Sequence, residues 1–158
     1  MKTIHVPSLP EEEAKSPTGK YHSFSRNISL ALGGIKDTGP WGGGHPFDLQ
    51  VRRVPPGKAV CPLHAHTVQW ELFFVVAGTA TVRVNGERHA VRAGDAVVQP
   101  PGTAHQIIND GNEDFVFHVI ADNSPADSTW YPESKKWQMK PQRKIFRMTE
   151  VDYHDGEE

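Results

Sequence analysis

The chain is divided into many short runs of strand-forming residues, each ended by a glycine- or proline-rich turn. These runs cover residues 47–54, 71–77, 79–84, 87–91, 96–99, 105–108 and 115–121. The pair Asn85-Gly86, between the third and fourth runs, is a strong indication of a tight β-hairpin. Short strands at this spacing, without amphipathic helices between them, predict an all-β sandwich or barrel.

Composition changes at both ends of this region. Residues 1–22 contain several prolines and an acidic cluster, so we predict a flexible arm there. Residues 23–122 hold the strand-like runs and form the predicted β domain, which is an ordinary size for a single core. Residues 123–158 begin with a turn-rich break and lack a clear period, apart from a possible strand at 143–149. We expect this extension to pack on the barrel or on a partner subunit.

Charge and cysteine content exclude several functions. The net charge is −2 and 23% of residues are charged, so we expect neither nucleic acid nor an acidic membrane as partner. The absence of a basic, DNA-reading helix also argues against a sensor domain that controls transcription. Cys61 is the single cysteine, which fits a reducing compartment. The N-terminus lacks the apolar core of a signal peptide, and we therefore expect a cytoplasmic location.

Three imidazoles and one carboxylate occur among the strand-like runs. His64 and His66 are two residues apart, so on an extended strand both side chains leave the same face. Glu71 begins an apolar run and shares its inward face with Phe73, where an unpaired carboxylate is costly. His105 follows a P-P-G-T-A turn that directs the next strand back toward the first. This donor set predicts one divalent transition metal: Zn, Mn, Fe, Ni or Cu.

The two segments that hold these residues resemble the paired motifs of the cupin superfamily. The match is carried by Gly57, His64, His66, Glu71 and Gly78, then by Gly94, Pro100, Gly102, His105 and Asn109. The resemblance extends over about residues 47–121 and is to small, single-domain members. It implies a cupin-type double-stranded β-helix, a jelly-roll barrel with the metal inside, and a homodimer. Residues 131–137 (Y-P-E-S-K-K-W) also resemble small bacterial cupins, some of them labelled sugar-phosphate isomerases.

Four protein ligands leave open positions on a five- or six-coordinate metal. Such a site suits a small substrate that chelates through two oxygens, such as a hydroxy or keto acid, a sugar phosphate or a catechol. We therefore expect a metal-dependent enzyme, either a dioxygenase, a decarboxylase or an isomerase. No general acid or base is evident beside the ligands, so no catalytic residue is assigned. The alternative is a non-catalytic cupin that binds a metal or a small ligand.

A substrate pocket is expected beside the metal. Its predicted lining residues are Arg53, Gln69, Phe73 and His118. Arg52 and Arg53 are adjacent on one strand, so only one can face inward, where it would hold a carboxylate or phosphate bidentately. His118 either points into the barrel or is an outward, hydrogen-bonded histidine. We interpret Cys61 as core packing rather than as a ligand or nucleophile.

Overall fold

The computed structural model describes residues 1–158, which form three antiparallel sheets with very little helix. The strands are β1 (Glu12–Lys15), β2 (His22–Asn27), β3 (Phe47–Val54), β4 (Lys58–Ala59), β5 (Ala65–His66), β6 (Glu71–Ala77), β7 (Thr79–Val84), β8 (Glu87–Arg92), β9 (Ala96–Gln99), β10 (His105–Asn109), β11 (Phe115–Asp122), β12 (Ser128–Tyr131), β13 (Lys136–Met139) and β14 (Lys144–Phe146). Helix is limited to α1 (Ile28–Ala31) and the 3-10 turns Val6–Ser8 and Pro40–Gly42. No helix is long or apolar enough to span a membrane.

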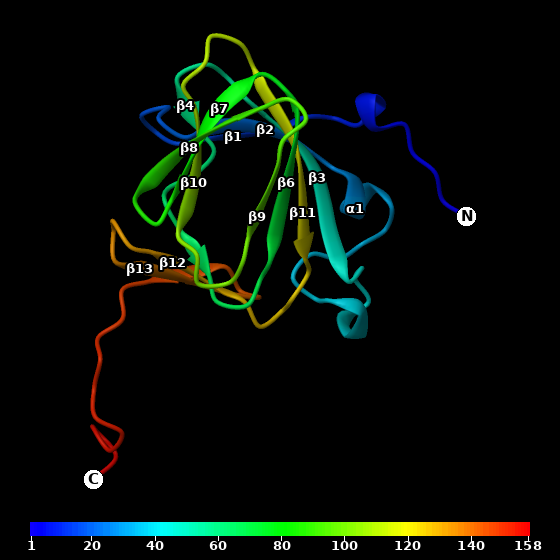
Figure 1. Cartoon of the computed structure of the whole chain (residues 1–158). Helices are drawn as coiled ribbons and strands as arrows, with labels where there is room; N and C mark the ends of the chain where they lie inside the picture. Colours follow the sequence, from blue (N-terminus) through cyan, green and yellow to red (C-terminus); the bar gives the residue numbers. More distant parts are fainter.

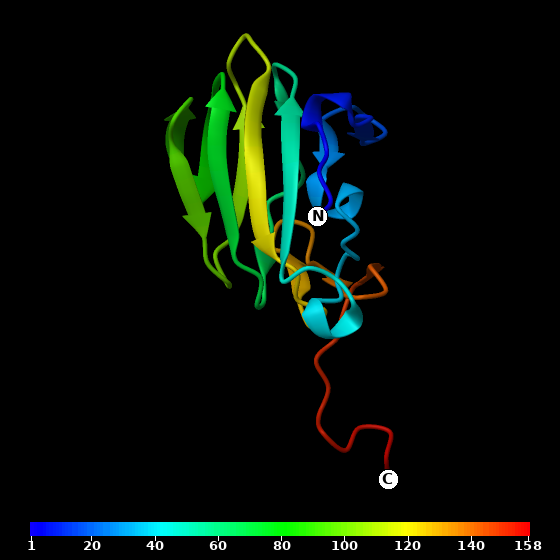
Figure 2. The same ribbon diagram turned by 90° about the vertical axis from the view of Figure 1, so that its right-hand side faces the viewer.

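Two of the sheets face each other and form the barrel (Figure 1). One has six strands in the order β1-β2-β3-β11-β6-β9, and the other has four in the order β4-β10-β7-β8. Figure 2 shows their long strands standing side by side. The two sheets are not joined into a closed ring, so the barrel is a sandwich with open edges. The predicted all-β, jelly-roll architecture is confirmed.

The hydrophobic core lies between these two sheets. It consists of Val54, Phe73, Val75, Ala80, Val82, Val91, Ile107, Phe115, Phe117 and Val119. On β6, Phe73 and Val75 are 5% and 1% exposed and point inward, whereas Phe74 between them is exposed. This alternation arises because successive side chains of a strand point to opposite faces. Burying each large apolar side chain contributes about 1.5–3 kcal/mol to the stability of the barrel.

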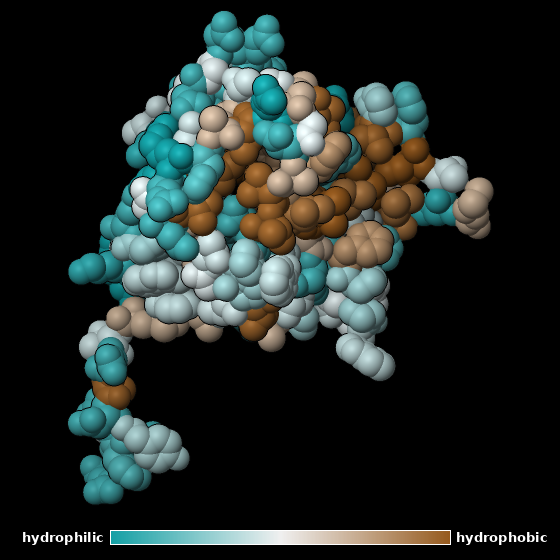
Figure 3. All heavy atoms as spheres, in the orientation of Figure 1, coloured by the Kyte–Doolittle hydropathy of each residue, from teal (hydrophilic) through white to brown (hydrophobic).

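The outer face of the six-stranded sheet is also apolar. Its exposed side chains include Leu72, Phe74, Val76, Val98 and Ile120. In Figure 3 apolar side chains gather over the part of the view where β6, β9 and β11 run in Figure 1. A contiguous apolar surface of this kind is typical of an interaction site.

The third sheet closes one end of the barrel (Figure 1). Its order is β14-β13-β12-β5, so the segment after the barrel adds its strands directly to the one that carries His66. Trp130 on β12 packs on Trp137 of β13, with ring centroids 5.0 Å apart. At the other terminus, residues 12–15 of the predicted arm form β1, which pairs with β2.

Candidate metal and ligand site

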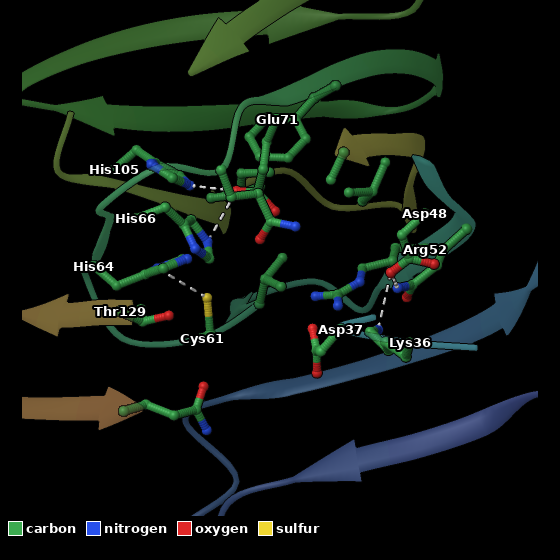
Figure 4. A pocket seen from close by; sticks show the side chains of 18 of the residues that line it. Lys36, Asp37, Asp48, Arg52, Cys61, His64, His66, Glu71, His105 and Thr129 are labelled. Atoms are coloured by element: carbon green, nitrogen blue, oxygen red, sulfur yellow. Dashed lines mark hydrogen bonds and ion pairs between the residues drawn. The ribbon is translucent and has the colours of Figure 1, made fainter. Parts of the chain in front are cut away.

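The four predicted ligands lie together at the end of the barrel that the third sheet covers (Figure 4). One ring nitrogen from each of His64 and His66 and one carboxylate oxygen of Glu71 lie within 4.8 Å of one another. Nε2 of His105 is 3.0 Å from Glu71 Oε2, and Nε2 of His66 is 3.5 Å from the same oxygen. Reciprocal backbone hydrogen bonds of 3.1 and 2.8 Å hold His64 beside His105. The structure therefore brings all four side chains into one cluster.

Each imidazole of the cluster has an oxygen acceptor at its Nδ1. The pairs are His64 with the Pro62 carbonyl (3.0 Å), His66 with Asp127 (2.7 Å) and His105 with the Thr103 carbonyl (3.0 Å). An Nδ1–H that donates to such an acceptor leaves the Nε2 lone pair free for a metal. The partners thus fix the tautomer in which every Nε2 can serve as a ligand.

His105 tests whether a metal fits the cluster. Its Nδ1 and its Nε2 both face oxygen acceptors at 3.0 Å, one from Thr103 and the other from Glu71. A neutral imidazole has only one N–H and cannot donate to both. A cation between Nε2 and the carboxylate satisfies both atoms, so the residues present fit a metal with nitrogen and oxygen ligands.

Asp127 orients His66 and was not identified from the sequence. Its side chain is fully buried and accepts hydrogen bonds from His66 Nδ1 at 2.7 Å and from the backbone N–H groups of residues 67–69 at 3.0–3.3 Å. Lys140 Nζ lies 3.1 Å from Oδ2 of Asp127. Burial disfavours the ionised carboxyl, but His66, these N–H groups and Lys140 outweigh it and hold the Asp127 pKa below its ordinary value. The separation of 61 positions between His66 and Asp127 explains why no local pattern indicated the contact.

Electrostatics favour the protonation states that metal ligands need. Burial alone would raise the pKa of Glu71, but the hydrogen bond with His105 and the electrostatic attraction of the neighbouring histidines lower it to about 2. Burial lowers the pKa of His64, which keeps this imidazole neutral. Burial also raises the pKa of the Cys61 thiol to about 11, although Sγ lies 3.5 Å from His64 Nδ1. A protonated, partly buried thiol agrees with the packing role expected for Cys61.

A cavity of about 220 Å³ adjoins the cluster, and all four predicted ligands line it. Part of the lining is apolar, with side chains from β6, β10 and β11, and another part carries charged and amide side chains from β3, the 36–37 loop and the third sheet. Gln69 and Phe73 line the cavity, as predicted from the sequence. Tyr131 also lines it and stacks on His64 with ring centroids 6.0 Å apart.

Arg53 and His118, also predicted to line the pocket, lie outside it. Arg53 points away from the cavity and forms ion pairs with Glu11 at 2.9 Å and Asp114 at 3.0 Å. Its neighbour Arg52 lines the cavity instead, because alternate residues of β3 face inward. His118 is excluded for the same reason, since its neighbours on both sides along β11 are the ones that face the cavity.

Residues 50–121, which contain all four predicted ligands, match the family described as the cupin domain. The chain therefore contains a cupin domain. This cupin is 34% identical over 68 residues to an oxalate-binding protein of Thermotoga maritima, a match that covers 43% of this chain and 55% of that protein. It is 29% identical over 109 residues to quercetin 2,3-dioxygenase of Bacillus subtilis, which covers 66% of this chain and 31% of that one. The cupin therefore spans about half and about a third of the lengths of these two relatives.

Among solved structures, the cupin resembles a sugar phosphate isomerase from Silicibacter pomeroyi that belongs to the cupin superfamily. The TM-score is 0.74 with 20% sequence identity, and the match covers 92% of each chain. At this identity the likeness shows a shared fold. Because it extends over nearly all of both chains, the strands outside the cupin domain belong to the shared architecture as well.

Proposed function

We propose that this cupin holds one divalent transition metal between His64, His66, Glu71 and His105 and acts on a small substrate that chelates the metal through oxygen. The observation that carries the proposal is the convergence of three imidazoles, each with its Nδ1 already engaged, around a buried carboxylate at the wall of a cavity. When bound, such an ion supplies Lewis-acid polarisation of a substrate oxygen. The mixed nitrogen and oxygen donors suit Zn, Mn, Fe, Ni or Cu.

The size and lining of the cavity support a small substrate. Its volume of about 220 Å³ is below the range of about 300–1,000 Å³ that is typical of drug-sized ligands. Hydroxy or keto acids, sugar phosphates of few carbons and catechols are of suitable size. The names of the similar proteins, an oxalate-binding protein, a quercetin dioxygenase and a sugar phosphate isomerase, all refer to oxygen-rich small molecules. We propose that this chain binds the same class.

The protein side chains then have distinct tasks. Asp127 holds the His66 ring in place, and the apolar wall that includes Phe73 and Phe117 excludes water. Burial raises the pKa of Tyr131, so its phenol stays protonated and donates a hydrogen bond to a substrate oxygen in the cavity. These residues bind and orient the substrate, and decarboxylation, isomerisation and dioxygenation are the reactions to test.

A second candidate function is binding without turnover. The observation that favours binding without turnover is that few side chains in the cavity are free to act as a general base. The carboxylates of Asp37, Asp48 and Asp127 are each paired with a lysine or arginine, and raised pKa values keep Cys61 and Tyr131 protonated. A cupin with such a cavity stores or senses its ligand as readily as it transforms it.

Metal analysis tests the site. The untagged chain is supplied in turn with Mn, Fe, Ni, Zn and Cu, and the bound metal per chain is measured after dialysis. We expect close to one ion in the wild type and in His89→Ala, an exposed imidazole far from the cluster, but none in His66→Ala. Loss of the ion also lowers the melting temperature, because a ligand that binds the native state stabilises it. No bound metal in the wild type with any of the five ions would refute the proposal.

Turnover assays separate the enzyme from the binding protein. The metal-loaded chain is incubated aerobically with oxalate, malate, catechol and small sugar phosphates, and products are followed by mass spectrometry. Product that disappears in His66→Ala supports the enzyme. Tight binding without product, for every metal form, supports the alternative.

We also propose that the cupin forms a homodimer in the cytoplasm. The exposed apolar face of the six-stranded sheet, with Phe74 near its middle, supports pairing with a second copy. The single cysteine, which leaves no intrachain disulfide to form, supports a reducing compartment. Light scattering of the wild type and of Phe74→Glu tests the dimer, and equal masses at the monomer value would exclude it.

A further inference from the structure

The cations that line the cavity are almost all neutralised by carboxylates. The ion pairs are Lys36 with Asp48 (3.0 Å), Lys140 with Asp127 (3.1 Å) and Asp37 (3.3 Å), and Arg143 with Asp37. Arg52 is the exception. No carboxylate lies within ion-pair distance of its guanidinium, and its Nε is shielded from solvent without a hydrogen-bond partner.

The position of Arg52 makes this exception informative. Asp48, Gln50 and Arg52 occupy inward-facing positions of β3, beside the apolar side chains that β11 turns toward the cavity. Figure 4 shows the Arg52 side chain projecting into the cavity, with the imidazole cluster on one side and Lys36 on the other. Its cross-strand neighbours are Ser25 and Phe117, neither of which carries a charge.

A desolvated, unpaired guanidinium such as that of Arg52 is expected to bind an anion. Its planar fork presents parallel N–H donors that match the two oxygens of a carboxylate or phosphate. Leaving such a donor desolvated and unpaired costs free energy, which an oxyanion in the cavity would recover. By contrast, Arg53 on the outer side of the same strand already holds two carboxylates and has no such need.

We propose that Arg52 anchors an anionic group of the ligand, a carboxylate or phosphate, at a point separate from the oxygens that chelate the metal. This inference rests on the proposed metal site and narrows its substrate class. Hydroxy or keto acids with a second carboxylate and phosphorylated hydroxy acids satisfy both points of attachment. Neutral chelators such as catechol satisfy only the metal.

Isothermal titration of the full-length, Mn²⁺-loaded chain with four probes tests the anchor. Glycolate chelates through a hydroxyl and a carboxylate, malate adds a second carboxylate, 3-phosphoglycerate adds a phosphate, and catechol chelates without an anchor group. We expect malate or 3-phosphoglycerate to bind about 10–100-fold more tightly than glycolate, as expected for a charge-assisted, bidentate hydrogen bond. The probe with the larger gain identifies carboxylate or phosphate as the anchored group.

Three variants assign this gain to Arg52. Arg52→Gln should bind malate and 3-phosphoglycerate no more tightly than glycolate. Arg52→Lys should keep part of the gain because it retains the charge without the fork, and Arg53→Gln should behave like the wild type. Thermal melting and metal content establish that each variant is folded and loaded. If Arg52→Gln does not fold, the comparison of Arg52→Lys with Arg53→Gln provides the same test.

The outcomes separate this inference from the proposed function. A gain that persists in a folded Arg52→Gln chain, or a wild type that binds glycolate and both larger acids equally, would overturn the anchor and leave the metal site intact. A wild type that binds none of Mn, Fe, Ni, Zn and Cu would overturn the metal site instead. Inorganic phosphate that binds the metal-free wild type but not metal-free Arg52→Gln would in that case still support the anchor.

Discussion

Replacing Asp127 with asparagine tests how far the metal cluster depends on the carboxylate behind it. Oδ1 of Asp127 accepts from the backbone N–H groups of residues 67–69, and Oδ2 accepts from His66 and faces Lys140. Both oxygens therefore face donors only. An asparagine has one acceptor oxygen and one NH₂ group, so either rotamer of its amide sets donor against donor.

The expected loss follows from these contacts. Removing the negative charge weakens the charge-assisted hydrogen bond to His66 and leaves Lys140 with less compensation in a buried position, where it is only 7% exposed. Breaking a buried pair of this kind costs about 3–5 kcal/mol of folding stability. The loss of the carboxylate that orients a metal-binding imidazole lowers metal affinity by about 10–100-fold.

Two measurements on the same variant check this reasoning. Urea unfolding of the metal-free chain gives the change in stability, and competition with a chelator gives the change in metal affinity. Asp122→Asn is the matched control, because Asp122 caps the backbone N–H of Trp70 at 2.9 Å and none of its hydrogen bonds or ion pairs involves an imidazole. If Asp127→Asn and Asp122→Asn both bind the metal as tightly as the wild type, the inference that Asp127 orients His66 for metal binding is wrong.

Four further outcomes are expected. The Glu71 pKa is lowered from 4.5 to about 2, so the contribution of Glu71 to stability is complete above pH 4.5 and is lost as the pH falls from 4.5 to about 2. Urea unfolding of the metal-free chain should show this loss of stability, and the loss should be smaller in Glu71→Gln. Phe117→Ala empties the fully buried centre of the core and should cost about 3–5 kcal/mol by the same assay, against less than 1 kcal/mol for a change at exposed Val98. Cys61, with its pKa raised to about 11, should react with a thiol reagent at pH 8 far more slowly in the native chain than in urea, and equal rates would contradict the raised pKa. Lys140→Met removes the cation between two buried carboxylates and should destabilise the chain by about 3 kcal/mol in urea unfolding, and an unchanged stability would contradict this role.

The sequence was sufficient for the barrel and for the imidazole cluster because both depend on local patterns. The predicted runs 47–54, 71–77 and 79–84 coincide with β3, β6 and β7, since each alternates in polarity or ends at a glycine or proline turn. The spacing of His64 and His66 is likewise a local pattern, because it involves only a few residues.

The sequence was insufficient where distant strands decide the outcome. On β3 and β11 apolar residues occur on both faces, so the pattern does not specify which face is inward, and Arg53 and His118 were assigned to the wrong one. The strands β12 and β13 were missed because all but one of their residues are only partly buried, which leaves no clear alternation. Asp127 reaches His66 only through the pairing of β12 with β5.

The pairing of β5 with β12 has a consequence for how the protein is made. During synthesis at about 5–20 residues per second, the three histidines and Glu71 leave the ribosome before Asp127 and Lys140 do. A nascent chain that has just completed its barrel therefore presents imidazoles whose orienting carboxylate does not yet exist. In the proposed metal site, tight capture of a cation would therefore wait until residue 140 has left the ribosome and the final sheet has docked.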